Sequence, residues 1–211
     1  MKFQNRLAAG TLLADQLKKY TNQKDVLILA LPRGGAIVAD PVAEKLKCPM
    51  DLCLVKKIGV PFHEELAMGA IAINTKPIFN EELLNQSGIS KEELNEIISE
   101  KENELRQRNK KYRKNKPAPD VKNKIVIIVD DGIATGATMH AAINAIKAQG
   151  TKKIIIAIPV ADKGICDEMK KLVDDVICLY QPPDLMSVGD WYVDFEQVAD
   201  EEVVYCLDKH Q

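Results

Sequence analysis

Short apolar runs rich in β-branched residues alternate with segments of helical periodicity along most of the chain. The runs are bounded by Gly, Pro, Asn or Asp and are far too short to cross a membrane, so they predict buried strands. We expect strands at 25–31, 51–55, 68–74, 126–129, 153–159 and 175–180. Helical periodicity occupies 5–20, 36–46, 139–147 and 161–173, and a last helix starts at Glu196. This alternation predicts an α/β fold with a doubly wound, mainly parallel sheet.

The middle of the chain, residues 80–120, has a different pattern. Ser90 and Glu93 form a capping-box start, and an apolar stripe follows at Leu94, Ile97, Ile98 and Leu105. The stripe runs into a basic stretch, 106–116, which ends at two prolines. We therefore expect a helical insertion that returns through a basic loop. The basic stretch has three interpretations: a solvated helix end, a mobile flap that closes on an anion, or an RNA-binding surface.

Length and composition fit one domain over residues 1–211, with residues 181–211 as a small C-terminal hood. The net charge of −2 provides no general attraction to nucleic acid or to an anionic membrane. The five cysteines are scattered without a CxxC pair, and the three histidines show no metal-binding spacing. No secretion signal or long apolar run is visible. We expect a cytoplasmic protein with free thiols and no membrane partner.

The strongest chemical signal is the stretch from Val126 to Met139, which reads as strand, acidic pair, small-residue loop and helix start. The backbone N–H groups of a helix start suit a phosphate, and Gly136 lets the backbone approach it closely. Thr135 and Thr138 add hydroxyl donors. Asp130 and Asp131 would repel a phosphate and are better suited to accept hydrogen bonds from hydroxyl groups. A phosphate beside a diol is a ribose 5-phosphate, which is the ligand that this stretch predicts.

Commoner nucleotide loops do not fit this stretch. A Walker A loop needs a lysine where Ala137 stands. A dinucleotide fingerprint has its acid about twenty residues after the glycines, whereas here the acids come before the loop. The alternative without a ligand is an ordinary strand-turn-helix with two solvated aspartates at its rim.

The order of four apolar residues, two acids and a Thr-Gly-x-Thr loop resembles the phosphoribosyl pyrophosphate signature of type I phosphoribosyltransferases. The resemblance implies that Asp130 and Asp131 position the ribose and that its 5-phosphate binds the loop at Ala134, Thr135, Gly136, Ala137 and Thr138. The loop is closer to adenine and uracil transferases than to the hypoxanthine-guanine branch. That branch has an aspartate at the position of Ala134, often assigned as the base acting on the purine. Ala134 cannot act as a base, so this sequence has no residue for that role at this position. The best match is a bacterial group of phosphoribosyltransferases with a long helical insertion.

Two further loops fit the pyrophosphate half of such a donor. Pro32-Arg33-Gly34-Gly35 follows the first strand, and two glycines and an Arg before a helix suit an anion, although a plain turn with a surface Arg is the alternative. In type I transferases this loop binds pyrophosphate, often with a non-proline cis peptide, which the resemblance places at Arg33–Gly34. Residues 55–61, at the end of the second strand, resemble the Arg-Lys-x-Gly-x-x-Pro segment of adenine transferases, which puts Lys57 on pyrophosphate. Two solvated lysines are the alternative there.

The resemblance assigns the remaining site residues. In a flap, Arg106 and Arg113 would face pyrophosphate. The stretch 188–195 resembles the hood of hypoxanthine-guanine transferases, so that Trp191 or Tyr192 would stack on the acceptor and Asp194 would join Asp130 and Asp131 at a metal. Aromatic residues are more often core, which is the alternative.

The implied reaction is transfer of 5-phosphoribosyl from phosphoribosyl pyrophosphate to a nitrogen acceptor, with nucleobases as the expected class, within nucleotide metabolism. Arg33 and Lys57 would neutralise the leaving pyrophosphate, and Mg²⁺ would bridge diol and pyrophosphate. The family also implies a homodimer. The rival interpretation is a regulator that binds the same donor without turnover and controls a partner or RNA, supported by the basic stretch and by Ala134. An ATP-dependent enzyme is disfavoured by the absent lysine.

Overall fold

The computed structural model describes residues 2–61, 63–73, 75–114 and 116–210, and of residues 63–67 it describes only the backbone. The chain divides into two compact units. The first unit comprises Met1–Cys53, Val121–Thr135 and Gly150–Gln211. The second unit comprises Leu54–Asp120 and Gly136–Gln149.

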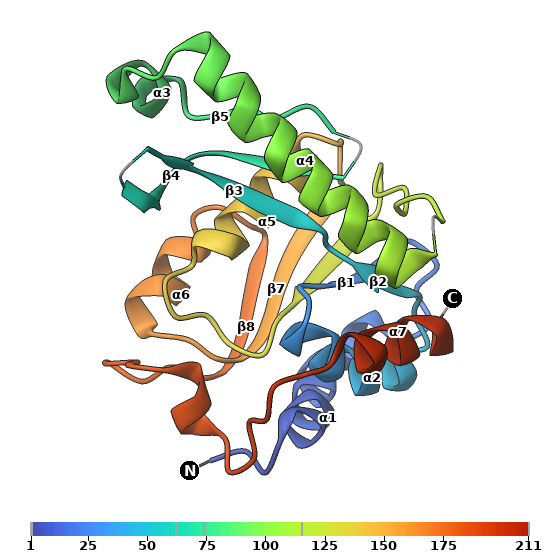
Figure 1. Cartoon of the computed structure of the whole chain (residues 1–211). Helices are drawn as coiled ribbons and strands as arrows, with labels where there is room; N and C mark the ends of the chain where they lie inside the picture. Colours follow the sequence, from blue (N-terminus) through green and yellow to red (C-terminus); the bar gives the residue numbers. More distant parts are fainter. Residues whose placement is uncertain (1, 62, 74, 115, 211) are drawn as a thin grey trace. The chain divides into compact units, whose positions relative to one another are not determined.

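The first unit is built on a five-stranded parallel sheet with the order β2-β1-β6-β7-β8 (Figure 1). Its strands are β1 Val26–Ala30, β2 Met50–Leu52, β6 Ile125–Val129, β7 Lys153–Val160 and β8 Asp175–Tyr180. Every residue of β1 and β6 is buried, which explains why these segments read as continuous apolar runs rather than as an alternation. The predicted α/β fold with a mainly parallel sheet is confirmed.

The helices of the first unit are α1 Arg6–Gln16, α2 Gly34–Leu46, α6 Lys163–Met169 and α7 Asp200–Lys209, with short 3-10 helices at Lys18–Tyr20 and Val188–Trp191. Helix α1 packs along α2, which in turn contacts β1, β2 and α7 (Figure 1). In the described part of the chain, no helix combines the length and the hydropathy that a membrane span requires.

An aromatic cluster joins the two ends of the chain within the first unit. Phe3 and Tyr192 are buried, and their ring centroids lie 5.4 Å apart. Tyr180 meets Phe3 edge-on at 5.5 Å, and Phe195 stacks beside Tyr192 at 4.9 Å. This cluster holds the segment after β8 against the start of the chain.

The second unit combines a three-stranded antiparallel sheet with three helices. The strands are β3 Val55–Val60, β4 His63–Ala72 and β5 Ile78–Phe79, in the order β3-β4-β5. The helices are α3 Glu81–Ser87, α4 Lys91–Arg113 and α5 Ala137–Lys147. Helices α4 and α5 both pack on β3 and β4. The capping box at Ser90 and Glu93 is present, as predicted.

Some predicted boundaries are wrong. The single strand expected at 51–55 is two strands in different sheets, β2 and β3, since the chain leaves the parallel sheet at Cys53 and Leu54. The strand expected at 68–74 is β4, which begins at His63; position 74 lies outside the described residues. The helix expected from Glu196 begins at Asp200, where Glu202 caps the Ala199 N–H at 2.8 Å.

Candidate functional site

The two acids and the Pro-Arg-Gly-Gly loop lie together at one edge of the parallel sheet. Strands β1 and β6 pair in register up to Ala30 and Val129, so the loops that follow them leave the sheet side by side. A Cβ atom on Gly34 would stand 1.9 Å from Oδ2 of Asp131. Only glycine therefore leaves room for this carboxylate, and two of the predicted loops are indeed neighbours.

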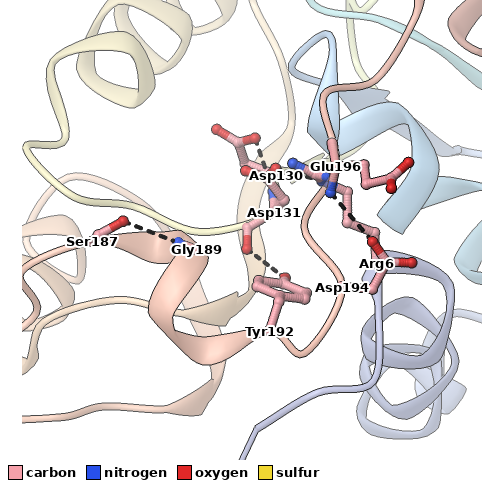
Figure 2. A network of polar contacts seen from close by, with 8 residues as sticks. All are labelled: Arg6, Asp130, Asp131, Ser187, Gly189, Tyr192, Asp194 and Glu196. Atoms are coloured by element: carbon pink, nitrogen blue, oxygen red, sulfur yellow. Dashed lines mark hydrogen bonds and ion pairs between the residues drawn. The ribbon is translucent and has the colours of Figure 1, made fainter.

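Asp131 is held by two side chains. Its Oδ2 receives the Nε–H of Arg6 at 2.7 Å, and its backbone carbonyl accepts the Tyr192 hydroxyl at 2.6 Å (Figure 2). The Arg6 and Asp131 side chains are 11% and 17% exposed, so this ion pair is largely shielded from water. Arg6 also donates from Nη1 to the Glu196 carbonyl at 2.8 Å. The position of Asp131 is thus set by residues from both ends of the chain.

Asp130 has a different environment. Its Oδ1 accepts the Asp131 backbone N–H at 2.8 Å, and in Figure 2 its carboxylate points away from Arg6. Burial, and then repulsion by Asp131, raise the pKa of Asp130 well above its ordinary value. A carboxylate in this state gains from any added hydroxyl donor or cation. The acidic pair is therefore suited to bind a ligand that brings hydroxyl groups or a metal ion.

The predicted phosphate loop continues from β6 into helix α5. Ile133 anchors its start by a bridge to Ala161 and an N–H bond to the Val160 carbonyl at 3.0 Å. Ala134 and Thr135 are exposed. Gly136 has φ of 78° and begins α5 without a side-chain cap, so the first N–H groups of this helix remain available to an anion. Ala137 and Thr138 lie at the start of the helix, and Ala137 is half-buried.

Arg33 immediately precedes α2 and is half-buried. A non-proline cis peptide is present in this loop, but it joins Pro32 to Arg33. The expected position, Arg33–Gly34, is one bond too far along the chain, because the resemblance identifies the loop rather than the bond within it.

Lys57 lies in the second unit, in the middle of β3 opposite Ala70 of β4. The predicted loop at the end of a parallel strand is therefore wrong for residues 55–60, which are an antiparallel strand with Val55 and Ile58 buried. The neighbouring Lys56 pairs with Glu104 of α4. A role for Lys57 at pyrophosphate stays a prediction.

The basic stretch is helical through Arg113 instead of forming a loop; position 115 lies outside the described residues. Arg106 is exposed and pairs with Glu102 one turn earlier at 2.8 Å. The Arg113 side chain is buried and donates to Oδ1 of Asn109 at 2.9 Å. Their contact with pyrophosphate also stays a prediction.

The predicted acceptor residues belong to the aromatic cluster. Tyr192 is only 3% exposed, because Phe3 and Phe195 cover its ring, so it has a packing role in this structure. Trp191 is half-buried beside Tyr180, with ring centroids 6.0 Å apart. Asp194 accepts the Glu196 N–H at 3.4 Å. Among the described residues no three metal-binding side chains converge, and a role for Asp194 at a metal with Asp130 and Asp131 stays a prediction.

Sequence reasoning missed Arg6 entirely. It is one of 29 lysines and arginines and belongs to no motif. Its partner Asp131 is 125 residues away, and only the packing of α1 beside the sheet brings the two together. No local signal in the sequence could have identified it.

Comparison with known proteins places this site in context. A family model described as the phosphoribosyl transferase domain matches residues 2–196. Two strains of Mycobacterium tuberculosis, CDC 1551 and H37Rv, have a protein provisionally assigned as a phosphoribosyl transferase, 36% identical over 207 residues. The match covers 98% of this chain but 46% of each relative, so the chain spans about half their length. The crystal structure of TT1426 from Thermus thermophilus is 34% identical and superposes with a TM-score of 0.90, covering 100% of this chain and 99% of that one.

Proposed function

The chain belongs to the phosphoribosyl transferase family, and from that premise we propose that it transfers 5-phosphoribosyl from phosphoribosyl pyrophosphate to a nitrogen acceptor, releasing pyrophosphate. One observation carries the proposal: an acidic pair at the end of β6 leads directly into a Thr-Gly-x-Thr loop and an uncapped helix start. Carboxylates followed by free N–H groups match a diol followed by a phosphate.

The ribose half of the donor binds this continuous stretch. Asp130 and Asp131 accept hydrogen bonds from the two ribose hydroxyl groups. The 5-phosphate binds the loop from Ala134 to Thr138, through the backbone N–H groups and the hydroxyls of Thr135 and Thr138. The positive end of the α5 dipole adds to the attraction of the phosphate.

Pyrophosphate binds the loop after β1, where Gly34 and Gly35 leave the backbone open and Arg33 supplies a charged fork. Lys57, Arg106 and Arg113 are further candidates for this charge, supported by resemblance alone. In the reaction the bond between the anomeric carbon and pyrophosphate breaks, and pyrophosphate leaves with the electron pair. The acceptor nitrogen forms the new bond to that carbon and loses its proton. Each well-placed charge contributes roughly 3–4 kcal/mol to such a step.

Mg²⁺ is the metal that the family implies, and the described carboxylates fit it as partial anchors. No protein cage of three ligands exists in the described part of the chain, but Mg²⁺ commonly takes one or two carboxylates together with substrate oxygens and water. Asp130 and Asp131 would hold it. When bound, it neutralises charge on the leaving group.

We propose the acceptor by chemical class only: it is a nitrogen nucleophile, and nucleobases are the expected members of that class. Trp191 is the candidate residue that would stack on it. The test is release of pyrophosphate from the donor with Mg²⁺ across a panel of purine and pyrimidine bases and other amines. Asp130→Asn/Asp131→Asn is the matched variant, because it keeps side-chain shape and removes both charges. We expect release with at least one acceptor and its loss in the variant. Equal release from both proteins would contradict the proposal.

A second candidate is a regulator that binds the donor without turnover. Ala134 favours it, because the exposed loop has an alanine where a catalytic acid stands in one branch of the family. Saturable donor binding without pyrophosphate release from any acceptor would support this function. RNA retention that is lost on neutralising the basic residues between 108 and 116 would identify its target. The family also implies a homodimer, and sedimentation would measure this oligomeric state.

A further inference from the structure

The two ends of the chain form a small clamp at the acidic pair, which we define as residues 3–6 and 191–196. Phe3 donates its N–H to the Trp191 carbonyl at 2.8 Å, and its carbonyl accepts the Val193 N–H at 2.8 Å. The Asp194 N–H donates to the Gln4 carbonyl at 3.0 Å. These backbone bonds fix the direction in which the chain enters α1, at whose first position Arg6 stands.

Arg6 is the side chain that the clamp presents to the site. Its Nε–H reaches Asp131 and its Nη1 the Glu196 carbonyl (Figure 2). Its guanidinium lies over the Phe195 ring, 3.7 Å from the centroid. A planar guanidinium held by a carboxylate, a carbonyl and an aromatic face has one orientation. A lysine could supply the charge but not this combination of directions.

The clamp contacts Asp131 through two of its polar atoms. Arg6 takes Oδ2 and Tyr192 takes the backbone carbonyl, so neither of these two groups occupies Oδ1. Gly34 stands directly against the same carboxylate. An ion pair that served stability alone could end on any acid, but this one ends on an acid of the proposed ribose site and is made through Oδ2.

We propose that Arg6 is a positioning residue of the donor site: it orients the Asp131 carboxylate so that Oδ1 faces the ribose hydroxyl groups. This inference rests on the proposed function. Arg6 acts through Asp131 and does not itself contact the donor. Its charge also offsets one of two adjacent carboxylates, which would otherwise repel each other without compensation.

The test is calorimetric titration with phosphoribosyl pyrophosphate and Mg²⁺, using wild type, Arg6→Gln, Arg6→Lys, Asp131→Asn and the double variant Arg6→Gln/Asp131→Asn. We expect Arg6→Gln to weaken donor binding roughly tenfold, the size of a lost charged hydrogen bond. Arg6→Lys should fall between it and wild type. In the Asp131→Asn background, Arg6→Gln should cause no further loss, because Arg6 acts through that carboxylate. Lys19→Gln, which breaks the exposed pair with Asp175 in the same unit, is the control and should bind as wild type.

Two results would overturn the inference. One is a folded Arg6→Gln variant that binds the donor as tightly as wild type. The other is an equal loss of donor affinity from Arg6→Gln in the wild-type and in the Asp131→Asn background. If Arg6→Gln does not fold, Arg6→Lys decides, since wild-type affinity in that variant would show that orientation is irrelevant. A wild-type protein that fails to bind the donor refutes the proposed function first, and so the two failures are distinguishable.

Discussion

The carboxyl group of Asp130 shares a partly buried position with a second carboxylate, and both circumstances raise its pKa. In the unfolded chain the same group ionises near pH ~3.9. Folding without ligand must therefore either place an unfavourable charge in the site at neutral pH or take up a proton there. A residue whose charge is needed for ligand binding is here a cost to the stability of the free protein.

We expect Asp130→Asn to stabilise the ligand-free protein at pH 7, raising Tm by about 2–4 °C for ~1 kcal/mol in a chain of this length. Because the folded pKa is raised, the wild type loses stability as pH climbs from the unfolded pKa through the folded one. The gain should therefore vanish below about pH 4, where both states of Asp130 are protonated. Thermal melts across pH, without divalent cations, measure this. Asp25→Asn, at an exposed ion pair with Lys152, is the control and should not raise Tm.

Tyr192 supports the neighbouring acid through its hydroxyl. Burial, with a smaller contribution from Asp131, raises the pKa of Tyr192 above its ordinary value, so the phenol stays a donor to the Asp131 carbonyl. Tyr192→Phe should cost about 1 kcal/mol of unfolding free energy, because a half-buried carbonyl loses its partner. Urea unfolding measures it. Tyr205→Phe, at a tyrosine that is 70% exposed, should be neutral; an equal cost in both variants would contradict a specific role for Tyr192.

At the scale of elements, α1, which begins with Arg6, packs closely on α2. A Cβ atom on Gly10 would lie 2.2 Å from the Val38 carbonyl oxygen and 2.6 Å from Cγ of Pro41. Gly10→Ala must therefore push the helices apart, and overpacking of this kind costs about 1–3 kcal/mol. We expect a lower Tm and weaker donor binding together. Thr11→Ala, at the next and exposed position of α1, should change neither; a harmless Gly10→Ala would show that this contact can yield.

The elements of the parallel sheet were predictable because the local pattern of apolar residues identifies a buried strand or an amphipathic helix. Strand β3 was not, because Leu52 to Val55 is one apolar run with no turn residue where the chain leaves the sheet. The change from parallel to antiparallel pairing depends on β4 as a partner, which lies later in the sequence. Local pattern therefore misplaced Lys57 at a strand end, although it located the α4 capping box correctly.

At the scale of the whole molecule, the same distinction separates the acidic pair from its support. Asp130, Asp131 and the loop after them are consecutive in sequence, so their order alone indicated a sugar phosphate. Arg6 and Tyr192 reach that pair from the two ends of the chain, and no sequence window contains both. Sequence reasoning found the groups expected to touch the ligand, but it missed Arg6 and assigned Tyr192 to the acceptor instead of to the support of Asp131.

Binding and stability can be separated in one experiment on the whole protein. A ligand that binds only the folded state stabilises it by about 2.7 kcal/mol at one hundred times Kd, which is about 5–10 °C in Tm here. We expect phosphoribosyl pyrophosphate with Mg²⁺ to give this shift and ATP with Mg²⁺ to give none, because the loop lacks the lysine of a Walker A motif. Differential scanning calorimetry at several donor concentrations measures it.

The variant Asp130→Asn/Asp131→Asn makes the same measurement decisive. Removing the repulsion between the two carboxylates should raise the Tm of the ligand-free variant, whereas losing the Arg6 ion pair should lower it. The comparison therefore uses only the shift in Tm that the donor causes in each protein. That shift should fall below about 2 °C, roughly the loss of two charged hydrogen-bond acceptors. A variant whose Tm still rises with donor as the wild type does would show that the sugar is held elsewhere, whatever the order of residues after β6 suggests.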